Sequence, residues 1–466
     1  MFSYLKSHSK PFLLIVLASA AASASMASGL SPFNGFIVFI FLTSILGSLF
    51  FWEYRLGFMF IGSAIYLLVG AVSPEEFVRY ASLDVILFLI SMMIVVGMMK
   101  DAGLFDWLVT LILRIKNLTG RKLFVLLMFI SAVFSSVMGE VASIMIMAVT
   151  IMEICDLLEV DPVPMIVCSV LATNLGSAAT VLGNPVGILI ASHSGLSFED
   201  FLSNALPHAT INLVIIIAFL LVYYRGYIRL ITPRLKEYTG DKTFIRLISI
   251  PSDRKTMISI CIFCTTIVLI ALHKRFELFL NLTENTLLLM FPILAAGVVM
   301  IYRHERSRLY IEKEIEWPSI IFFMFLFAQA GVIHATGTAG TLAKNLFAFA
   351  GDTQTLGALI LFSSGLFSSV LDNVVAVATY IPLIKEFQTF GVPDNNLWWA
   401  LLFGACFGGN ITMIGSTANI VALGLLEKQL NIKVTFIEWF RIGFVVGVIT
   451  LFTTWGLLYF HLGSAP

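Results

Sequence analysis

The sequence predicts an all-α polytopic membrane protein, built as an inverted repeat of two halves that each hold a re-entrant helical hairpin and a broken transmembrane helix. Three observations lead to this fold class. Of 466 residues, 59% are hydrophobic and only 12% are charged, whereas soluble domains carry about 25% charged residues. Several apolar segments approach the ~20 residues that cross a bilayer. Four blocks of the first half recur in the second.

The membrane helices are expected wherever the apolar sequence runs without interruption. The first such segment follows Lys6 and Lys10 and resembles a signal peptide, but we favour a first transmembrane helix. Two further apolar regions, 123–193 and 354–426, are interrupted by Gly, Pro and polar residues. The uninterrupted segments are 11–29, 33–51, 56–72, 85–99, 209–224, 256–272, 283–301, 317–334 and 440–460.

The distribution of Lys and Arg predicts the orientation, because cytoplasmic loops carry an excess of both. The segments 114–122 and 225–255 are basic, whereas 193–208 and 350–357 contain no Lys or Arg. We therefore expect a multi-pass protein of the plasma or inner membrane, with a cytoplasmic N-terminus and an external C-terminus. Lys274 and Arg275 oppose this pattern, since they fall in a short loop on the outer side.

The internal repeat keeps four blocks in the same order. LDVILFLISMMIVVGMMKDAG (83–103) matches WPSIIFFMFLFAQAGVIHATG (317–337), and FSSV at 134–137 recurs at 367–370. NLGSAATVLGNPVGI (174–188) matches CFGGNITMIGSTANI (406–420), and SFEDFL matches TFIEWF further on. By the charge pattern the two copies enter the membrane from opposite sides, which is typical of secondary transporters.

The Gly-rich blocks predict broken helices. Gly183-Asn184-Pro185 cannot continue an ordinary helix, and 408–419 holds three glycines among Asn, Ser and Thr. Each block is expected to form a helix, an unwound polar loop and a second helix. Half-helix N-termini offer N–H groups to an anion, and freed carbonyls suit a cation. The alternative, close packing of small residues, does not need the Asn and Thr beside each glycine.

The FSSV blocks predict two hairpins whose tips meet near the midplane of the membrane. Glu140 and Asp372 follow the repeated letters inside apolar sequence. A carboxylate at this depth costs about 2.5–3.5 kcal/mol and needs a partner, a cation or a proton. We expect both to carry the coupling proton or cation, or to cap the second helix of their hairpin.

These blocks together resemble the ion transporter superfamily, with the arsenite permease and sodium–proton antiporter family as the best match and the divalent anion–sodium symporters as distant relatives. The resemblance covers about residues 75–225 and 310–460. It implies the inverted repeat, a dimerising scaffold and an elevator-like movement of the transport part. By carry-over, the substrate and ion site would comprise Ser135, Ser136, Glu140, Asn174, Thr180, Asn184, Ser368, Ser369, Asp372, Asn373, Asn410, Thr412, Ser416, Thr417 and Asn419.

Two departures from the family pattern bear on the substrate. The first broken loop reads Gly-Asn-Pro-Val-Gly, where relatives commonly have Gly-Asp-Pro-Pro-Asn. The hairpin tips lack the Ser-Asn-Thr triplet of the sodium-coupled dicarboxylate branch. Coupling through the carboxylates, to protons or a cation, is favoured instead.

The expected organisation follows from these blocks. Scaffold helices occupy 1–74 and 256–309, and a cytoplasmic linker occupies 226–255. The first repeat spans 75–225, with its hairpin at about 123–155 and its broken helix at about 163–193. The second repeat spans 310–460, with its hairpin at about 354–390 and its broken helix at about 397–426.

The predicted function is secondary transport of a small ion, metalloid or oxyanion, with arsenite efflux driven by protons or membrane potential favoured. Na⁺/H⁺ antiport and cation-coupled transport of a carboxylate or sulfate are the alternatives, and an ion channel is an alternative of another class. We expect a homodimer that contacts the lipid bilayer and needs no cofactor beyond Na⁺ or H⁺ as coupling ion.

Several other functions are disfavoured. No catalytic constellation supports an enzyme, and a net charge of zero gives no field for nucleic acid. Cys261 and Cys264 have the spacing of a metal or redox pair, but they lie inside an apolar segment without a second pair, so no metal site is expected. No P-loop is present, so a primary pump would need a separate ATPase partner, an alternative that stays open.

Overall fold

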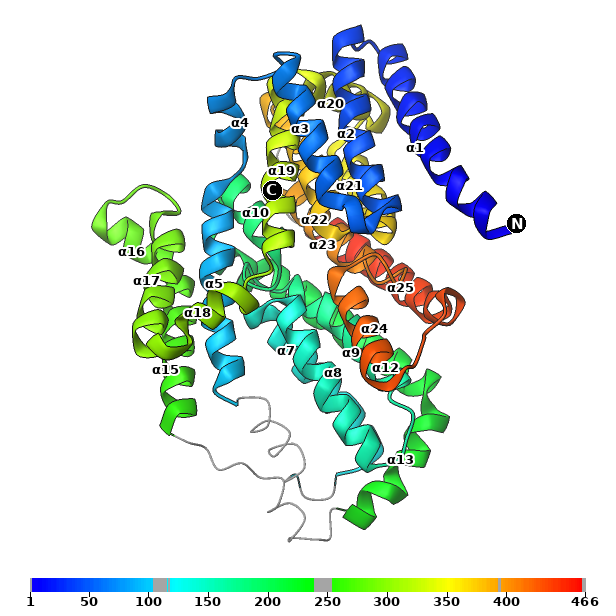
Figure 1. Ribbon diagram of the computed structural model, residues 1–466, viewed down its shortest axis with the longest axis vertical. Coiled ribbons are helices and arrows are strands. Elements are labelled where there is room, and N and C mark those ends of the chain that lie inside the picture. Colours follow the sequence, from blue (N-terminus) through cyan, green and yellow to red (C-terminus); the bar gives the residue numbers. More distant parts are fainter. Residues whose placement is uncertain (1, 104–114, 116–117, 239–253, 393–394, 463–466) are drawn as a thin grey trace. The chain divides into compact units, whose positions relative to one another are not determined.

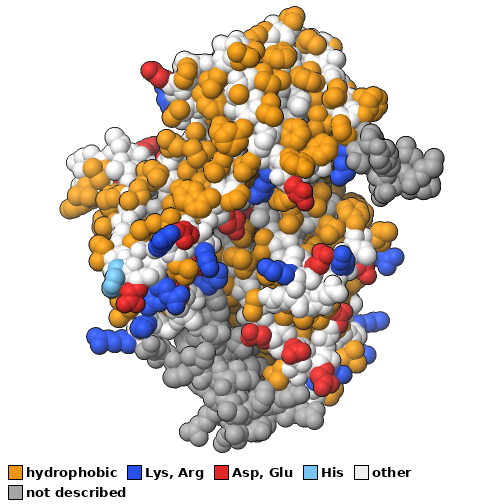
Figure 2. Space-filling model, viewed as in Figure 1, with side chains coloured by type: hydrophobic (Ala, Val, Ile, Leu, Met, Phe, Trp, Pro, Cys, Tyr) orange, Lys and Arg blue, Asp and Glu red, His pale blue; other side chains and the backbone are white. Residues whose placement is uncertain are grey.

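The computed structural model describes residues 2–103, 115, 118–238, 254–392 and 395–462 (Figure 1). Within these ranges every regular element is a helix. Nine of the described helices are long and apolar enough to cross a membrane, and hydrophobic side chains cover much of the face drawn in Figure 2. The prediction of an all-helical, multi-pass membrane protein is therefore confirmed at this level.

The nine helices do not coincide with the nine predicted segments. The segment 56–72 forms only the 14-residue helix α3 (Arg55–Leu68), and 283–301 forms the 17-residue α17 (Thr286–Tyr302). Two hairpin helices meet the length and hydropathy criteria instead, α7 (Gly120–Met138) and α21 (Thr353–Val370). The α3 segment is shortened because the chain turns at Gly70, which has a φ of +68°.

The predicted linker 226–255 is helical over its first part, while residues 239–253 lie outside the described residues. There the chain forms α13 (Arg225–Tyr238). Ile228, Ile231 and Leu235 recur at helical spacing and are buried. This apolar stripe explains the helix, because an amphipathic helix buries one face against its neighbours.

By compactness the chain divides into two units, each made of three stretches of sequence. The first unit comprises residues 1–87, 316–364 and 374–401, and the second comprises 88–315, 365–373 and 402–466. Four helices contribute residues to both units: α5 (Leu83–Asp101), α21, α22 (Asn373–Thr389) and α23 (Asn395–Gly408).

The first unit contains α1 (Phe2–Ala27), α2 (Pro32–Phe50), α3, α4 (Pro74–Tyr80), α19 (Trp317–Ala335) and α20 (Thr338–Ala350). α19 packs against both α3 and α4. Gln329 of α19, fully buried, donates to the Met59 carbonyl at 3.0 Å and to Ser63 Oγ at 3.1 Å. These bonds satisfy the Nε2 group of Gln329, which would be costly to leave unpaired in an apolar interior, whereas its Oε1 has no partner among the described residues.

The second unit is larger and holds the remaining helices. It includes α7, α8 (Glu140–Leu157), α9 (Val163–Ser177), α10 (Pro185–Ser194), α12 (Leu206–Tyr223), α13, α15 (Arg254–Ala271), α16 (His273–Leu280), α17, α24 (Thr417–Leu430) and α25 (Phe436–Leu462). Short helical turns, α11 (Phe198–Asp200), a π-helical turn at Phe201–Ala205 and α18 (Ser307–Leu309), connect longer ones. α7, α8 and α9 pack against one another (Figure 1).

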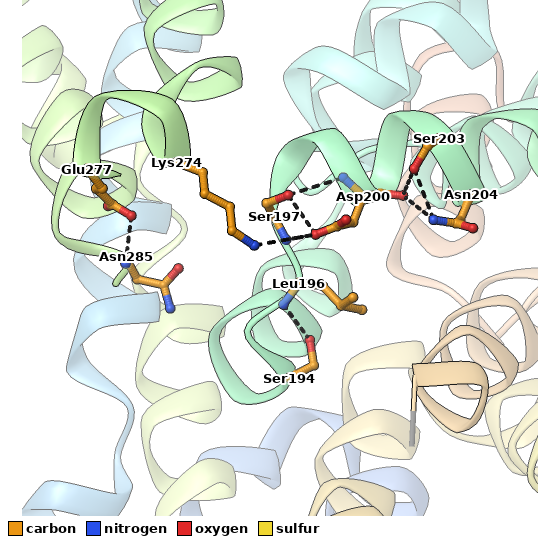
Figure 3. A network of polar contacts seen from close by, with 9 residues as sticks. All are labelled: Ser194, Leu196, Ser197, Asp200, Ser203, Asn204, Lys274, Glu277 and Asn285. Carbon is orange, nitrogen blue, oxygen red and sulfur yellow. Dashed lines mark hydrogen bonds and ion pairs between the residues drawn. The ribbon is translucent and has the colours of Figure 1, made fainter. Parts of the chain in front are cut away.

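A polar network within the second unit joins α16 to α11 (Figure 3). Lys274 lies 3.9 Å from Asp200, and Arg275 lies 2.5 Å from Glu199. Ser197 and Asp200 form a capping box at the start of α11, which holds the carboxylate in place. Lys274 and Arg275, which opposed the charge pattern, thus form ion pairs with carboxylates of the segment 193–208.

Candidate functional site

The tip of the first hairpin is a single residue between two helices. α7 ends at Met138 and α8 begins at Glu140. Gly139 between them has φ +89°, a backbone conformation that residues other than glycine rarely adopt. Glu140 therefore occupies the first position of α8, where a carboxylate interacts favourably with the helix dipole. It is only 3% exposed.

The tip of the second hairpin carries a different pair of side chains. α21 ends at Val370 and α22 begins at Asn373. Asp372 accepts a hydrogen bond from Thr417 Oγ1 at 2.5 Å, so this carboxylate is tied to the start of α24. Asn373 is 1% exposed and takes the position in α22 that Glu140 takes in α8.

The two tips contact each other. Asn373 Nδ2 lies 3.2 Å from both Glu140 Oε1 and Glu140 Oε2. In the first broken helix, Asn184 donates to Ser177 Oγ at 2.9 Å. The Glu140 carboxyl group thus accepts hydrogen bonds from a neutral amide, and the charge of the Asp372 carboxylate also acts on it.

The first broken helix is unwound between Ser177, where α9 ends, and Pro185, where α10 begins. Asn184 caps α10 by accepting from the Gly187 N–H at 2.9 Å. Thr180, within the break, donates to the Ser136 carbonyl of the hairpin and accepts from Leu182 N at 3.1 Å. The break is therefore fastened to the hairpin tip through one threonine.

The second broken helix repeats this arrangement. α23 ends at Gly408 and α24 begins at Thr417, capped by Ser416. Thr412 donates to the Ser369 carbonyl of the second hairpin and accepts from Ile414 N at 3.3 Å. Thr412 aligns with Thr180 in the sequence repeat, and Ser369 aligns with Ser136, so equivalent residues make equivalent contacts.

Glycines bring each broken helix against its hairpin at backbone distance. A Cβ at Gly176 would lie 2.1 Å from the Ala132 carbonyl oxygen, and one at Gly408 would lie 2.2 Å from the Gly365 carbonyl oxygen. Ala132 and Gly365 are again equivalent positions in the repeat. The glycines of these blocks therefore allow close helix packing and also lie at or next to a break in the helix. Both interpretations of the Gly-rich sequence apply.

Three buried asparagines join the two broken helices. Asn174 Nδ2 donates to Asn410 Oδ1 at 2.7 Å and to Asn419 Oδ1 at 2.9 Å, while Asn174 Oδ1 accepts from Ser416 Oγ at 3.1 Å. Asn419 in turn donates to the Gly409 and Thr412 carbonyls at 2.8 and 2.9 Å. These bonds hold Asn174, Asn410 and Asn419 in place between the two broken helices, and their role in binding substrate or ion stays a prediction.

The predicted site residues lie at the two hairpin tips and in the two broken helices, and one of them, Ser135, lacks a side-chain hydrogen bond among the described residues. All fifteen lie in the second unit, although they come from three separate stretches of the chain. Ser368 donates to the Ala405 carbonyl at 2.6 Å. Ser135 is the exception: it is fully buried, and its Oγ has no hydrogen-bond partner among the described residues.

Two residues near Glu140 were not predicted. Ser177 Oγ accepts from Asn184 at 2.9 Å, and Cys406 Sγ lies 3.1 Å from Asn184 Nδ2. The repeat held a usable signal, because Cys406 aligns with Asn174, the central residue of the asparagine network.

Comparisons with known proteins identify the family. A family model described as citrate transporter (CitMHS) matches residues 54–404. The 46 kDa membrane protein of Mycobacterium leprae is 29% identical over 84% of this chain and 90% of its own length. An uncharacterized transporter of Mycobacterium tuberculosis is 30% identical over 79% of this chain and 83% of its own length.

Two more distant similarities also involve long matches to this chain. The human P protein is 25% identical over 81% of this chain and 53% of its own length. The crystal structure of the Alcanivorax borkumensis YdaH transporter, described as having an unusual topology, shares the fold with a TM-score of 0.52 at 16% identity, over 86% of this chain and 89% of that one. Because the family model spans well over half of the residues, this chain belongs to the citrate transporter (CitMHS) family of membrane transporters, within the ion transporter superfamily that its motifs resemble.

Proposed function

We propose that this chain is a secondary active transporter of a small carboxylate, with citrate as the first candidate, in which Glu140 carries the coupling proton or cation. The observation that supports this most directly is the contact between Glu140 and Asn373. A buried carboxylate held only by neutral donors keeps a net charge in an apolar surrounding, which is costly unless a proton or cation compensates it.

The choice of a carboxylate substrate rests on the family description. The same unit offers two half-helix N-termini, those of α10 and α24, and such termini favour anionic groups. Arsenite efflux and Na⁺/H⁺ exchange, which the sequence reading ranked above carboxylate transport, become the alternatives.

We further propose that the two hairpins and broken helices form an inverted repeat that moves as one body in an elevator-like cycle of a homodimer. Equivalent contacts at Thr180 and Thr412, and at Gly176 and Gly408, support two copies of one structural unit. The N-terminus is proposed to lie inside the cell and the C-terminus outside.

Uptake into proteoliposomes tests this proposal. The purified full chain is reconstituted, and uptake of radiolabelled citrate, sulfate and arsenite is measured under an imposed pH gradient, Na⁺ gradient or membrane potential. We expect saturable citrate uptake driven by one of these gradients and the loss of that drive in Glu140→Gln. Glu277→Gln is the matched control, since Glu277 is 5% exposed and accepts from Asn285 and Leu287 N–H groups away from this site.

Each alternative gives a different result. Uptake of arsenite but not citrate would reassign the substrate, and Na⁺-driven proton movement without an anion would indicate an antiporter. Flux that does not saturate and carries single-channel current would indicate a channel. Gradient-driven citrate uptake that is unchanged in Glu140→Gln would refute the role of Glu140.

A further inference from the structure

The outer face of α13 is basic and apolar at once. Arg225, Gly226, Arg229, Leu230 and Pro233 are all exposed on this helix, and Leu230 is 64% exposed. By helical geometry they lie on one side, opposite the buried stripe of Ile228, Ile231 and Leu235. Over residues 225–235, where the structure describes the side chains, this outer face carries two arginines and no carboxylate.

The position of α13 along the chain places it at the edge of the membrane. The apolar span Phe198–Tyr223 ends two residues before the helix begins. Tyr223, Tyr224 and Tyr227 cluster at this turn, with ring centroids 4.9 and 6.4 Å apart. Tyrosines are enriched where lipid headgroups meet water, and the adjacent Val222 and Tyr223 are 68% and 50% exposed.

The inner face of α13 is fixed to the base of the first hairpin and the first broken helix. Thr232 Oγ1 accepts from Gly120 N at 3.1 Å, at the start of α7. Arg234 donates to the Leu158 carbonyl at 2.6 Å, at the end of α8. Tyr227 donates to the Asp161 carbonyl at 2.5 Å, just before α9. α13 therefore contacts the ends of three helices that carry site residues.

We propose that the outer face of α13 is a binding surface for anionic phospholipid headgroups. Arg225 and Arg229, four residues apart, supply the charge, and Val222, Tyr223 and Leu230 enter the acyl boundary beside them. Basic residues next to a membrane helix attract anionic lipid by about 1 kcal/mol each. Because the inner face holds the hairpin base, lipid bound here would affect the same unit that carries Glu140.

Lipid binding to the full chain tests the proposal. The purified protein in neutral detergent is titrated with short-chain phosphatidylglycerol or short-chain phosphatidylcholine, and binding is followed by microscale thermophoresis. We expect tighter binding of phosphatidylglycerol, a roughly 30-fold loss of that affinity in R225Q/R229Q at 0.1 M NaCl, and a loss of the preference at 1 M NaCl. The affinity for phosphatidylcholine should not change.

The control removes two exposed cations elsewhere. Arg308 and Lys433 have side chains that are 85% and 71% exposed, and R308Q/K433Q lowers the net charge equally. This control should keep the preference for phosphatidylglycerol. If R225Q/R229Q does not fold, the single variants R225Q and R229Q should each lose about fivefold.

Three outcomes would overturn the proposal. They are equal affinity for the two lipids, an equal loss in both double variants, or a preference that R225Q/R229Q leaves intact. Release by R225Q/R229Q of a copurifying soluble protein, with unchanged lipid affinities, would assign the face to a protein partner instead.

Discussion

Replacing Gly176 by alanine should separate α9 from α7 and destabilise the protein. The added Cβ would lie 2.1, 2.5 and 2.6 Å from the carbonyl oxygen, Cα and carbonyl carbon of Ala132. All three are backbone atoms, so no side-chain rotation can relieve the clash. Reaching an ordinary contact of about 3.5 Å requires the helices to move apart by about 1.4 Å.

The expected loss of unfolding free energy follows from the rigidity of packed interiors. Overpacking a core by a methylene group costs about 1–3 kcal/mol, and a clash with backbone belongs at or above the upper end. We expect G176A to lower the free energy of unfolding by about 3 kcal/mol or more. That is more than a hundredfold change in the ratio of folded to unfolded protein.

Unfolding of the detergent-solubilised chain by sodium dodecyl sulfate gives the measurement, with helix content followed by circular dichroism. G408A should behave like G176A, because its Cβ would lie 2.2 Å from the Gly365 carbonyl oxygen. G424A is the control: Gly424 is exposed within α24, and a Cβ there meets nothing within 4 Å. It should lose no stability, since alanine favours helix over glycine by about 0.5–1 kcal/mol. Stability of G176A equal to that of G424A would refute the packing.

Two further predictions concern the buried network and the ion pairs of α16, both measured by the same unfolding assay. N174A should cost about 3 kcal/mol or more, because it leaves the buried acceptors Asn410 Oδ1 and Asn419 Oδ1 without their donor. N174D should not restore stability, since a carboxylate cannot donate to them. R275Q should change stability by less than about 1 kcal/mol, because its side chain is 71% exposed. E277A on the same helix should cost more, because two backbone N–H groups lose their acceptor. Equal effects of R275Q and E277A would contradict this contrast.

The sequence was sufficient to predict where helices end and begin around the site. Glycine and proline restrict the backbone locally, so Gly183-Asn184-Pro185 marks a break without knowledge of the fold. The structure ends α9 at Ser177 and begins α10 at Pro185. Gly139 likewise ends α7, because its positive φ is a local property. The repeat then pointed to the corresponding elements of the second half.

The partners of the site residues could not be predicted in this way. A pattern of asparagines does not show which amide faces which, and Asn174 pairs with Asn410 and Asn419 across more than 230 residues. The sequence suggested that these asparagines bind substrate, which stays a prediction, and it did not show that they hydrogen-bond to one another. α13 was missed for a related reason: its charges indicated a loop, and its apolar stripe was overlooked.

The most informative feature of the repeat is the position at which its two copies differ. Glu140 and Asn373 are each the first residue of the second hairpin helix. Two glutamates there would place like charges together, and two asparagines would leave no carboxyl group at this position of either hairpin. One of each allows Asn373 to donate to both oxygens of the Glu140 carboxylate. Protonation of Glu140 would remove one of these acceptors from Asn373 Nδ2. The link between the hairpin tips would then depend on the charge state of Glu140, which is the property that a coupled transporter needs.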